Sequence, residues 1–207
     1  MALLPSVGIV ATGASSVGMS PGTQSPVRLG QMADQIVTQL HPRYYEQTYR
    51  GNRFVIANQA AVTTTAALAT TYTGLVVGNP AGSTVNLVMD KFCCAQFAVG
   101  AAGAVGIMTG ASTTAITATL IPRNRKVGGA ASQAAANAGQ TIGTPVLEQV
   151  FGSVGSLATT GYGLQPAVVV DLEGGLIIPP GFFVAAYTTV VTTSALIFGF
   201  EWTEVPQ

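Results

Sequence analysis

Charged residues are scarce in this sequence. They make up 8% of its 207 residues, whereas they make up about 25% of an ordinary soluble domain. Eight lysines and arginines balance eight aspartates and glutamates, and a net charge near zero promotes association between copies of a protein. We therefore expect self-association rather than a free monomeric enzyme. A long basic tract is also missing, so no nucleic acid is expected as a partner.

Residues that commonly carry out chemistry are equally few. His41 is the single histidine, and Cys93 and Cys94 are adjacent, without the CxxC spacing of metal sites. A GxSxG nucleophile motif is missing. The spacing of the carboxylates alone leaves an inverting glycosidase pair open, but no set of residues fits the roles of an active site. We predict a protein that is not an enzyme, binds no cofactor or metal, and keeps both thiols reduced as packing residues.

Long hydrophobic runs are missing too. The best candidate for a membrane span, Ala95–Met108, contains three glycines and is shorter than the roughly 20 apolar residues that a spanning helix needs. Arg28 is the first positive charge, so residues 1–30 lack the basic start of a secretory signal. We therefore expect no membrane partner. The two reduced thiols also indicate folding in a reducing cytosol.

Small and β-branched residues, punctuated by glycine and proline, dominate what remains. This composition is typical of short strands joined by tight turns. In the segment 198–205, Phe198, Phe200 and Trp202 alternate with Glu201, which predicts a strand with the tryptophan in the core. We predict an all-β, antiparallel, jelly-roll-like sandwich over residues 54–207. The expected strands are Phe54–Val62, Leu75–Val77, Val85–Val99, Val105–Met108, Ile116–Ile121, Ala167–Leu172, Leu176–Ile178, Phe182–Val191 and Ala195–Val205.

Residues 1–53 differ from the rest and are interpreted as an extended N-terminal arm. Residues 1–26 carry no charge. Apolar residues over Leu29–Leu40 recur with helical spacing, although the segment Ile36–Leu40 also suits an extended chain. A cluster rich in tyrosine and arginine then follows. Such residues are enriched in interface hot spots, but the cluster could equally pack on its own domain. Its members are Arg43, Tyr44, Tyr45, Tyr49, Arg50 and Arg53.

A second basic cluster, Arg123, Arg125 and Lys126, precedes a stretch of small residues over Val127–Gly143. The stretch is interpreted either as a long solvated loop or as a loop that lies on a partner, because loops of this length are usually functional or disordered. Both basic clusters are therefore candidate interface residues.

Three segments carry a resemblance to a known class of proteins. They are Leu40–Phe54, Asn79–Leu87 and Gly175–Gly181, and each resembles a segment of small virion proteins of tailed bacteriophages. More broadly, the chain resembles jelly-roll decoration (cement) proteins. The resemblance implies a homotrimer that binds the major capsid protein or other virion proteins and stabilises the shell. It also implies location in the virion after assembly in the host cytoplasm.

Two alternatives stay open at this point. One is a receptor- or glycan-binding module of a head or tail fibre, for which a single tryptophan offers few exposed aromatic platforms. The other is a jelly-roll capsid protein that forms the shell itself. The chain does not begin with a basic arm that could neutralise genome phosphates, since residues 1–26 carry no charge, and this argues against the second alternative.

Overall fold

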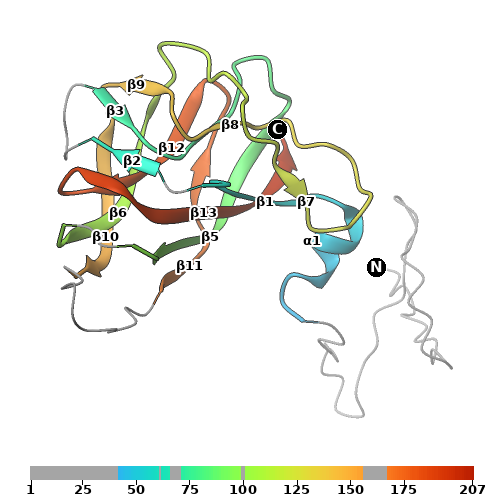
Figure 1. The fold of residues 1–207 in the computed structure, drawn as a ribbon. Coiled ribbons are helices and arrows are strands. Elements are labelled where there is room, and N and C mark those ends of the chain that lie inside the picture. The colour runs from blue at the N-terminus through green and yellow to red at the C-terminus, as the bar shows by residue number, and fades with distance from the viewer. Residues whose placement is uncertain (1–41, 61, 66–70, 99–100, 156–166) are drawn as a thin grey trace, which may run out of the picture. The chain divides into compact units, whose positions relative to one another are not determined.

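Two antiparallel sheets packed face to face form a β-sandwich (Figure 1). The computed structural model describes residues 42–60, 62–65, 71–98, 101–155 and 167–207. The first sheet has the order β11-β5-β13-β1-β7, and β2 also pairs with β13. Its strands are β11 (Val168–Ile178), β5 (Val85–Gln96), β13 (Thr192–Pro206), β1 (Arg53–Ala57), β7 (Arg123–Asn124) and β2 (Val62–Thr64).

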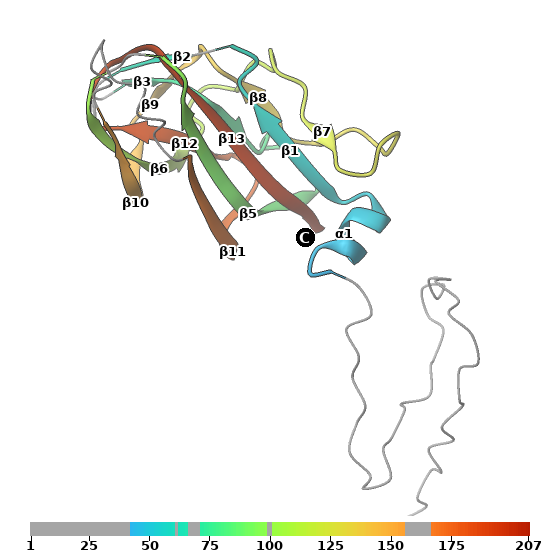
Figure 2. The ribbon, with the colours of Figure 1, turned by 60° about the horizontal axis from the view of Figure 1, so that its bottom comes forward.

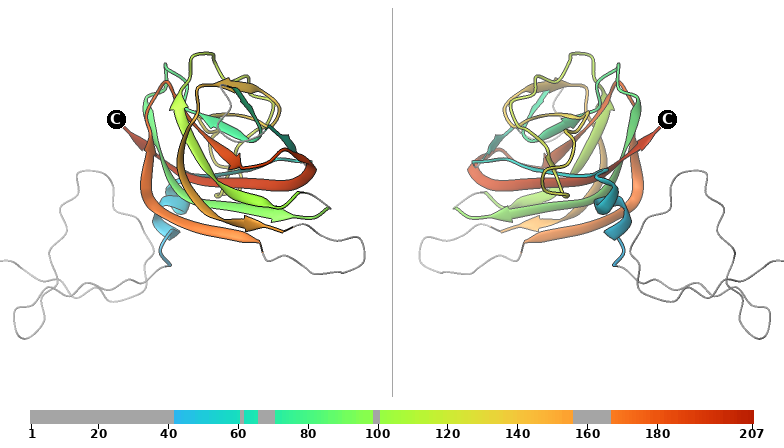
Figure 3. Two further views of the ribbon diagram at one scale, coloured as in Figure 1. Left: turned by 90° about the vertical axis from the view of Figure 1, so that its left-hand side faces the viewer. Right: turned by 90° about the vertical axis from the view of Figure 1, so that its right-hand side faces the viewer.

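The second sheet has the order β10-β6-β12-β4-β8. Its strands are β10 (Val146–Val154), β6 (Gly103–Ala111), β12 (Phe182–Thr188), β4 (Val76–Gly78) and β8 (Ala135–Asn137). A separate pair consists of β3 (Thr71–Thr73) and β9 (Thr141–Gly143), and one short helix, α1 (Tyr45–Arg50), precedes β1. Figure 2 shows β11, β5, β13 and β1 side by side in one layer, and Figure 3 shows the two layers from the sides.

Consecutive long strands alternate between the two sheets. From β4 to β6 and again from β10 to β13, each strand lies in the sheet opposite to the one before it. The resulting orders, β11-β5-β13-β1 and β10-β6-β12-β4, are those of a jelly roll, in which two Greek keys fold over one core. The predicted fold is therefore confirmed.

The core lies between the two sheets and is rich in aromatic side chains. Phe198, Phe200 and Trp202 from β13 are fully buried, as their alternation predicted. Phe54 on β1 stacks on Trp202 with 6.1 Å between the ring centroids. Each such side chain stabilises the fold by about 1.5–3 kcal/mol through removal of apolar surface from water.

A bulge at Asp90 lets β5 keep its apolar side chains in the core on both sides of two charged residues. Along the pairing with β13, Glu201 faces Lys91 and Trp202 faces Met89, so Asp90 is the extra residue. Met89 and Phe92 are both buried in the core, although they are three positions apart. The extra residue shifts by one position which side chains face the core. Asp90 itself therefore lies on the outer face of the first sheet.

Asn58 divides the segment that was predicted as one strand, Phe54–Val62. Its buried side chain accepts a hydrogen bond from the Phe198 amide at 2.6 Å and donates one to the Ala60 carbonyl at 2.6 Å. These bonds replace the regular ladder, and the chain leaves β1 and enters β2 beyond the break. The prediction of a continuous strand was wrong because a buried amide side chain competes with the backbone for partners.

The predicted strand Ile116–Ile121 is also wrong. Within it, Leu120 forms an isolated bridge with Ala136, and the rest is a loop over the second sheet. Ile116 packs directly on Gly78, where an added Cβ would lie 2.5 Å from the Ile116 Cγ1 atom. Ile116 thus covers a second apolar cluster, which includes Phe183 and Met108, whereas Leu120 packs on the main core. Because this loop covers the outer face of the second sheet, Ile116 packs on apolar side chains without being part of a strand.

Two further differences concern strands at the edges of the sheets. The segments Ala167–Leu172 and Leu176–Ile178 were predicted as two strands around a turn at Gly174-Gly175, but they form one strand, β11, with an irregularity between Asp171 and Leu176. The strand β10 was not predicted. It has two register shifts against β6 and is largely exposed, so its sequence lacks a clear alternation of apolar residues.

The stretch of small residues after the second basic cluster packs on the chain's own domain. It contains β8 and β9, and its Ala134 and Ala136 are buried in the main core. The Glu204 carboxylate fixes the entrance to this stretch by accepting bonds from the Ser132 hydroxyl and from the Gln133 amide, the latter at 3.0 Å. The interpretation of the whole stretch as a solvated or partner-bound loop is therefore wrong for this part.

The N-terminal boundary of the sandwich also differs from the prediction. The compact unit that includes the sandwich runs from Tyr44 to Gln207, whereas residues 1–53 were assigned to the arm. The tyrosine- and arginine-rich cluster lies in the turn before α1, in α1 itself and at the start of β1. The helix predicted over Leu29–Leu40 lies outside the described residues.

Candidate functional site

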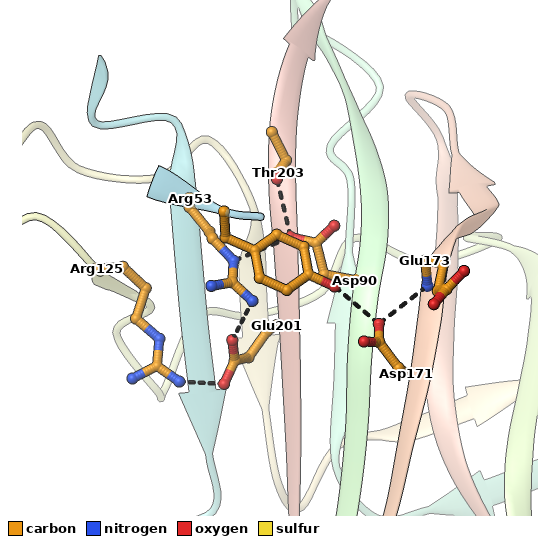
Figure 4. A network of polar contacts seen from close by, with 8 residues as sticks. Arg53, Asp90, Arg125, Asp171, Glu173, Glu201 and Thr203 are labelled. Atoms are coloured by element: carbon orange, nitrogen blue, oxygen red, sulfur yellow. Dashed lines mark hydrogen bonds and ion pairs between the residues drawn. The ribbon is translucent and has the colours of Figure 1, made fainter. Parts of the chain in front are cut away.

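A buried arginine lies at the centre of a polar network on the outer face of the first sheet (Figure 4). Arg53 is 8% exposed. Its Nε atom donates to the Asp90 Oδ2 atom at 3.1 Å, and the Thr203 hydroxyl donates to the same oxygen at 2.9 Å. The bulge in β5 brings Asp90 within reach, and the pairing of Arg53 with Thr203 in register aligns the other two residues.

Glu201 joins this arginine to the second basic cluster. One carboxylate oxygen accepts from the Arg53 Nη2 atom at 2.7 Å, and the other accepts from the Arg125 guanidinium. Two cations therefore bracket one carboxylate that is itself mostly buried. Buried charges are tolerated when they are paired and hydrogen-bonded in this way.

Tyr44 covers the network from the N-terminal side. The Arg53 guanidinium carbon lies 3.7 Å from the centroid of the Tyr44 ring, a cation–π contact. The Tyr44 hydroxyl donates to the Asp171 Oδ1 atom at 2.8 Å (Figure 4). Since Asp171 lies on β11 and Arg53 on β1, this one side chain connects two strands that are separated by β13 and β5 in the sheet.

Helix α1 contacts the loop that surrounds β7. Asn124 donates from its amide nitrogen to the Gly51 carbonyl at 2.7 Å, just after the helix ends. The Lys126 ammonium lies 5.3 Å from the centroid of the Tyr49 ring. None of the helix residues is buried, so α1 is held by its ends and by these contacts rather than by an apolar face.

The segment 121–128, here named the β7 ridge, presents aliphatic and basic side chains to solvent. Ile121 is 83% exposed and Val127 is 98% exposed. The three cations of the second basic cluster lie between them in the sequence. Asn124 fixes the ridge from within, because its side chain also bonds the Ala130 carbonyl and the Lys126 amide. The ridge therefore combines large exposed aliphatic groups with positive charge on a constrained backbone.

The structure brings the two predicted basic clusters together at one end of the first sheet. Arg53 and Tyr44 pack on their own domain, and Arg125 belongs to the same network. Exposed side chains among the predicted residues are Arg43, Tyr49, Arg50, Arg123, Arg125 and Lys126, while Tyr45 is half-buried and stacks on Tyr49. Sequence reasoning therefore found these residues but could not divide them between packing and surface roles.

Sequence reasoning missed the acidic half of the network and the aliphatic half of the ridge. Asp90, Glu201 and Asp171 are on three different strands, so only the sheet pairing brings them to the arginines. The charged pair Asp90-Lys91 inside an apolar run was the one available signal for the bulge. Ile121 and Val127 were taken as ordinary strand and loop residues, because exposure cannot be read from an isolated aliphatic residue.

The two thiols are poorly suited to nucleophilic chemistry. Burial raises the pKa of the Cys94 thiol to about 12, and the neighbouring Cys93 adds to this rise. Burial also raises the pKa of the Cys93 thiol, with a further rise from the Glu201 carboxylate. Reactive cysteines need a lowered pKa, so both side chains act as packing residues at neutral pH.

The described residues contain no group of three or more histidine, cysteine, aspartate or glutamate side chains that could hold a metal. A hollow of about 180 Å³ lies near the turn after β11, and its lining includes Asn79, Ser112, Ile116 and Gly181 but no ionisable side chain. In the part of the chain that is described, no helix is long and apolar enough to cross a membrane.

Comparisons of the chain with protein-family models, curated proteins and solved structures gave no match. The function must therefore be argued from the fold and from the surface chemistry of the network and the ridge.

Proposed function

We propose that the chain is a non-enzymatic structural protein of a virion, a decoration protein that associates with itself, as a trimer, and attaches to the capsid shell. The β7 ridge is the observation that carries this proposal. A lone exposed aliphatic residue is ordinary, but here two of them are almost fully exposed on either side of a basic cluster and on a backbone that Asn124 constrains.

The polar network supports a structural role for the neighbouring residues. Arg53, Asp90 and Glu201 satisfy one another inside the domain, so they hold α1 and the ridge in position rather than face a substrate. Tyr44 adds a contact across four strands of the sheet. A surface supported in this way is preorganised, which lowers the entropy lost when a partner binds.

The fold and the resemblance agree with this proposal. Jelly rolls recur in viral capsid domains as well as in lectins and cupins, so the fold alone is an analogy and does not establish a function. The low charge of the chain favours assembly over a free monomeric state. Together with the resemblance of three segments to phage virion proteins, these properties favour the virion reading over a soluble enzyme.

Replacement of the exposed aliphatic groups of the ridge tests the proposal. The variant Ile121→Ser/Val127→Ser should keep the melting temperature of the wild type, because neither side chain is buried, yet lose association measured by light scattering and lose its place in purified particles. Val191→Ser is the matched control, since Val191 is exposed but lies outside the ridge. A wild-type chain that stays at 21.0 kDa up to high concentration and is absent from particles analysed by mass spectrometry would refute the proposal.

A further inference from the structure

Two buried oxygen atoms belong to residues that line the hollow near the turn after β11, and neither has a hydrogen-bond partner among the described residues. They are the Oδ1 atom of Asn79 and the hydroxyl of Ser112. Only three buried side-chain atoms in the described part of the chain are unpaired in this way. Buried polar atoms are almost always paired, so two unpaired ones in the lining of one hollow indicate a binding site.

The side-chain amide of Asn79 has a defined orientation. Its nitrogen atom donates to the Val85 carbonyl at 2.8 Å and to the Ile178 carbonyl at 3.0 Å, which uses both of its protons. A flipped amide would instead place Oδ1 against two carbonyl oxygens, so the network excludes it. Since Asn79 is 1% exposed, its Oδ1 atom is a fixed, buried acceptor that lacks a donor.

Backbone bonds tie the two residues to the same turn. The Gly181 amide donates to the Asn79 carbonyl at 2.8 Å, and the Ser112 amide donates to the Gly181 carbonyl at 2.8 Å. The backbone of Ser112 is therefore fixed, while its hydroxyl can rotate to donate or to accept a hydrogen bond. Together the two side chains offer one acceptor and one adaptable hydroxyl.

The rest of the lining is mostly apolar. It includes Pro80, Ala81, Ala115 and Ile116, and no ionisable side chain of the described residues takes part. A charged group would lose hydration here without compensation, which favours a neutral ligand. The hollow has a volume of about 180 Å³, below the roughly 300–1,000 Å³ of sites for drug-sized ligands, so it suits one group of a larger molecule.

We propose that the hollow binds the acetamido group of an N-acetylated amino sugar. The N–H of this group donates to the Asn79 Oδ1 atom, and its carbonyl oxygen accepts from the Ser112 hydroxyl. Its methyl group contacts the apolar side of the hollow, which includes Ile116. A sugar hydroxyl alone offers no apolar part, and a carboxylate is charged and offers no donor.

Binding requires a small movement of the lining, because neither oxygen atom is open to solvent. Ser112 and Ile116 both lie on the segment between β6 and β7, and this segment is the part of the lining that can move without disturbing the long strands. A ligand that pairs both oxygens removes the penalty of leaving them unpaired. This inference is independent of the proposed attachment to a shell.

Saturation-transfer NMR with the full chain tests the site in any state of association. N-acetylglucosamine should receive saturation mainly at its methyl protons and bind with a Kd on the order of 1 mM. Glucose, which lacks the acetamido group, should bind about tenfold more weakly or less. N-ε-acetyl-lysine should also bind more weakly, because its flexible chain loses more conformational freedom on binding than a sugar ring does.

Two variants and a matched control locate the binding. Ser112→Ala should weaken N-acetylglucosamine binding about tenfold but keep the melting temperature of the wild type, because the hydroxyl has no partner among the described residues. Ala115→Phe should fill the hollow and abolish the transfer. Ala118→Phe is the control, since Ala118 is exposed on the same segment but does not line the hollow.

Several outcomes would overturn the site. One is no transfer to N-acetylglucosamine, the result expected if water alone pairs the two oxygens, and another is transfer that Ser112→Ala and Ala115→Phe leave unchanged. Binding of N-ε-acetyl-lysine as tight as that of the sugar would overturn the sugar as the ligand class. Failure here leaves the proposed association and attachment intact, whereas a chain that binds the sugar but is absent from particles would remove the proposed function and keep this site.

Discussion

Arg53 is a buried cation whose charge is balanced by two carboxylates from different strands. Asp90 and Glu201 would each be left without their main partner if this guanidinium were removed. An isolated buried charge is far more costly than a buried pair is favourable. Loss of Arg53 is therefore costly mainly because it leaves two buried carboxylates without their main partner, and less because the ion pair itself is stabilising.

Arg53→Met should lower the free energy of unfolding by about 3–5 kcal/mol, the usual cost of breaking a buried ion pair on one side. Urea denaturation followed by the fluorescence of Trp202 measures the change. Arg50→Met serves as the control, because the Arg50–Glu46 pair is an exposed pair one helical turn apart and such pairs contribute at most about 0.5 kcal/mol. Equal effects for the two variants would contradict the role assigned to Arg53.

Cys94 makes stability depend on alkaline pH. Its thiol pKa is raised by burial from 9.0 to about 12, so the folded state keeps a proton that the unfolded state releases in this range. The contribution is fully present below pH 9 and is lost as the pH rises toward 12. The free energy of unfolding should fall by up to about 1.4 kcal/mol per pH unit.

The pH dependence is measured by urea denaturation between pH 8 and 11 for the wild type and for Cys94→Ala. The slope should be shallower in the variant, because the titrating thiol is gone while every other side chain is the same in both proteins. Cys93→Ala should reduce the slope less, since Cys93 is only half-buried. An unchanged slope in Cys94→Ala would show that this thiol titrates equally in the folded and unfolded states.

At the scale of elements, the bulge in β5 lets the apolar residues before it and those after it face the same core. Leu87 and Met89 face the core before it, and Phe92 and Cys94 face the core after it. A regular strand would turn one of these pairs outward, because side chains alternate strictly. The extra residue, Asp90, keeps both pairs inside and supplies the carboxylate that Arg53 needs.

Deletion of single residues tests this account of β5. A chain without Asp90 should fold into the same sandwich, since Met89 and Lys91 already face consecutive residues of β13 and the alternation becomes regular. A chain without Met89 has the same length but moves Asp90 into the core, so it should fail to fold. Near-ultraviolet circular dichroism of Trp202 distinguishes the two results, and a folded Met89 deletion would contradict the role of the bulge.

The sequence was informative about elements wherever a strand has one buried and one exposed face. Phe198, Phe200 and Trp202 alternate on β13, and that pattern predicted both the strand and the core position of the tryptophan. It failed where both faces of a sheet are covered, as at Ile116, whose packing on Gly78 depends on a loop over the second sheet. It also failed at Asn58, because the buried hydrogen bonds that end β1 come from residues far along the chain.

The candidate site was only partly predictable for a related reason. The arginines and tyrosines were visible as two basic clusters, and their enrichment over the rest of a poorly charged chain was a usable signal. Their partners Asp90, Glu201 and Asp171 are brought to them by the order of strands in the sheet, which depends on long-range pairing. The division between the buried Arg53 and the exposed Arg123 likewise depends on which strand lies next to β1.

At the scale of the whole molecule, the sandwich uses the residues just before β1 as part of its own structure. The compact unit begins at Tyr44, and the Tyr44 hydroxyl and the Arg53 guanidinium both bind carboxylates of the first sheet. The division between arm and domain therefore lies nearer to residue 43 than to residue 53.

Two truncations should separate these alternatives. A chain that begins at Pro42 should melt within a few degrees of the full chain, because the contacts of Tyr44, α1 and Arg53 are retained. A chain that begins at Phe54 loses the cation that balances Asp90 and Glu201, so its melting temperature should fall by more than about 10 °C. Similar melting of both truncated chains would return the boundary to residue 53.

The two ends of the sandwich lie beside each other, since the Glu204 amide donates to the Asn52 carbonyl at 2.8 Å. A short linker could therefore join the end of β13 to the residues before α1, and the turn at Pro179-Pro180-Gly181, where Pro179 is exposed, could supply new termini for a circularly permuted chain. The same closeness makes the sandwich suitable for insertion into a surface loop of a host protein. At Asn52 and Glu204 the two chain segments have the spacing of neighbouring strands, about 4.8 Å, and a host would also have to accommodate α1 (Tyr45–Arg50), which precedes Asn52.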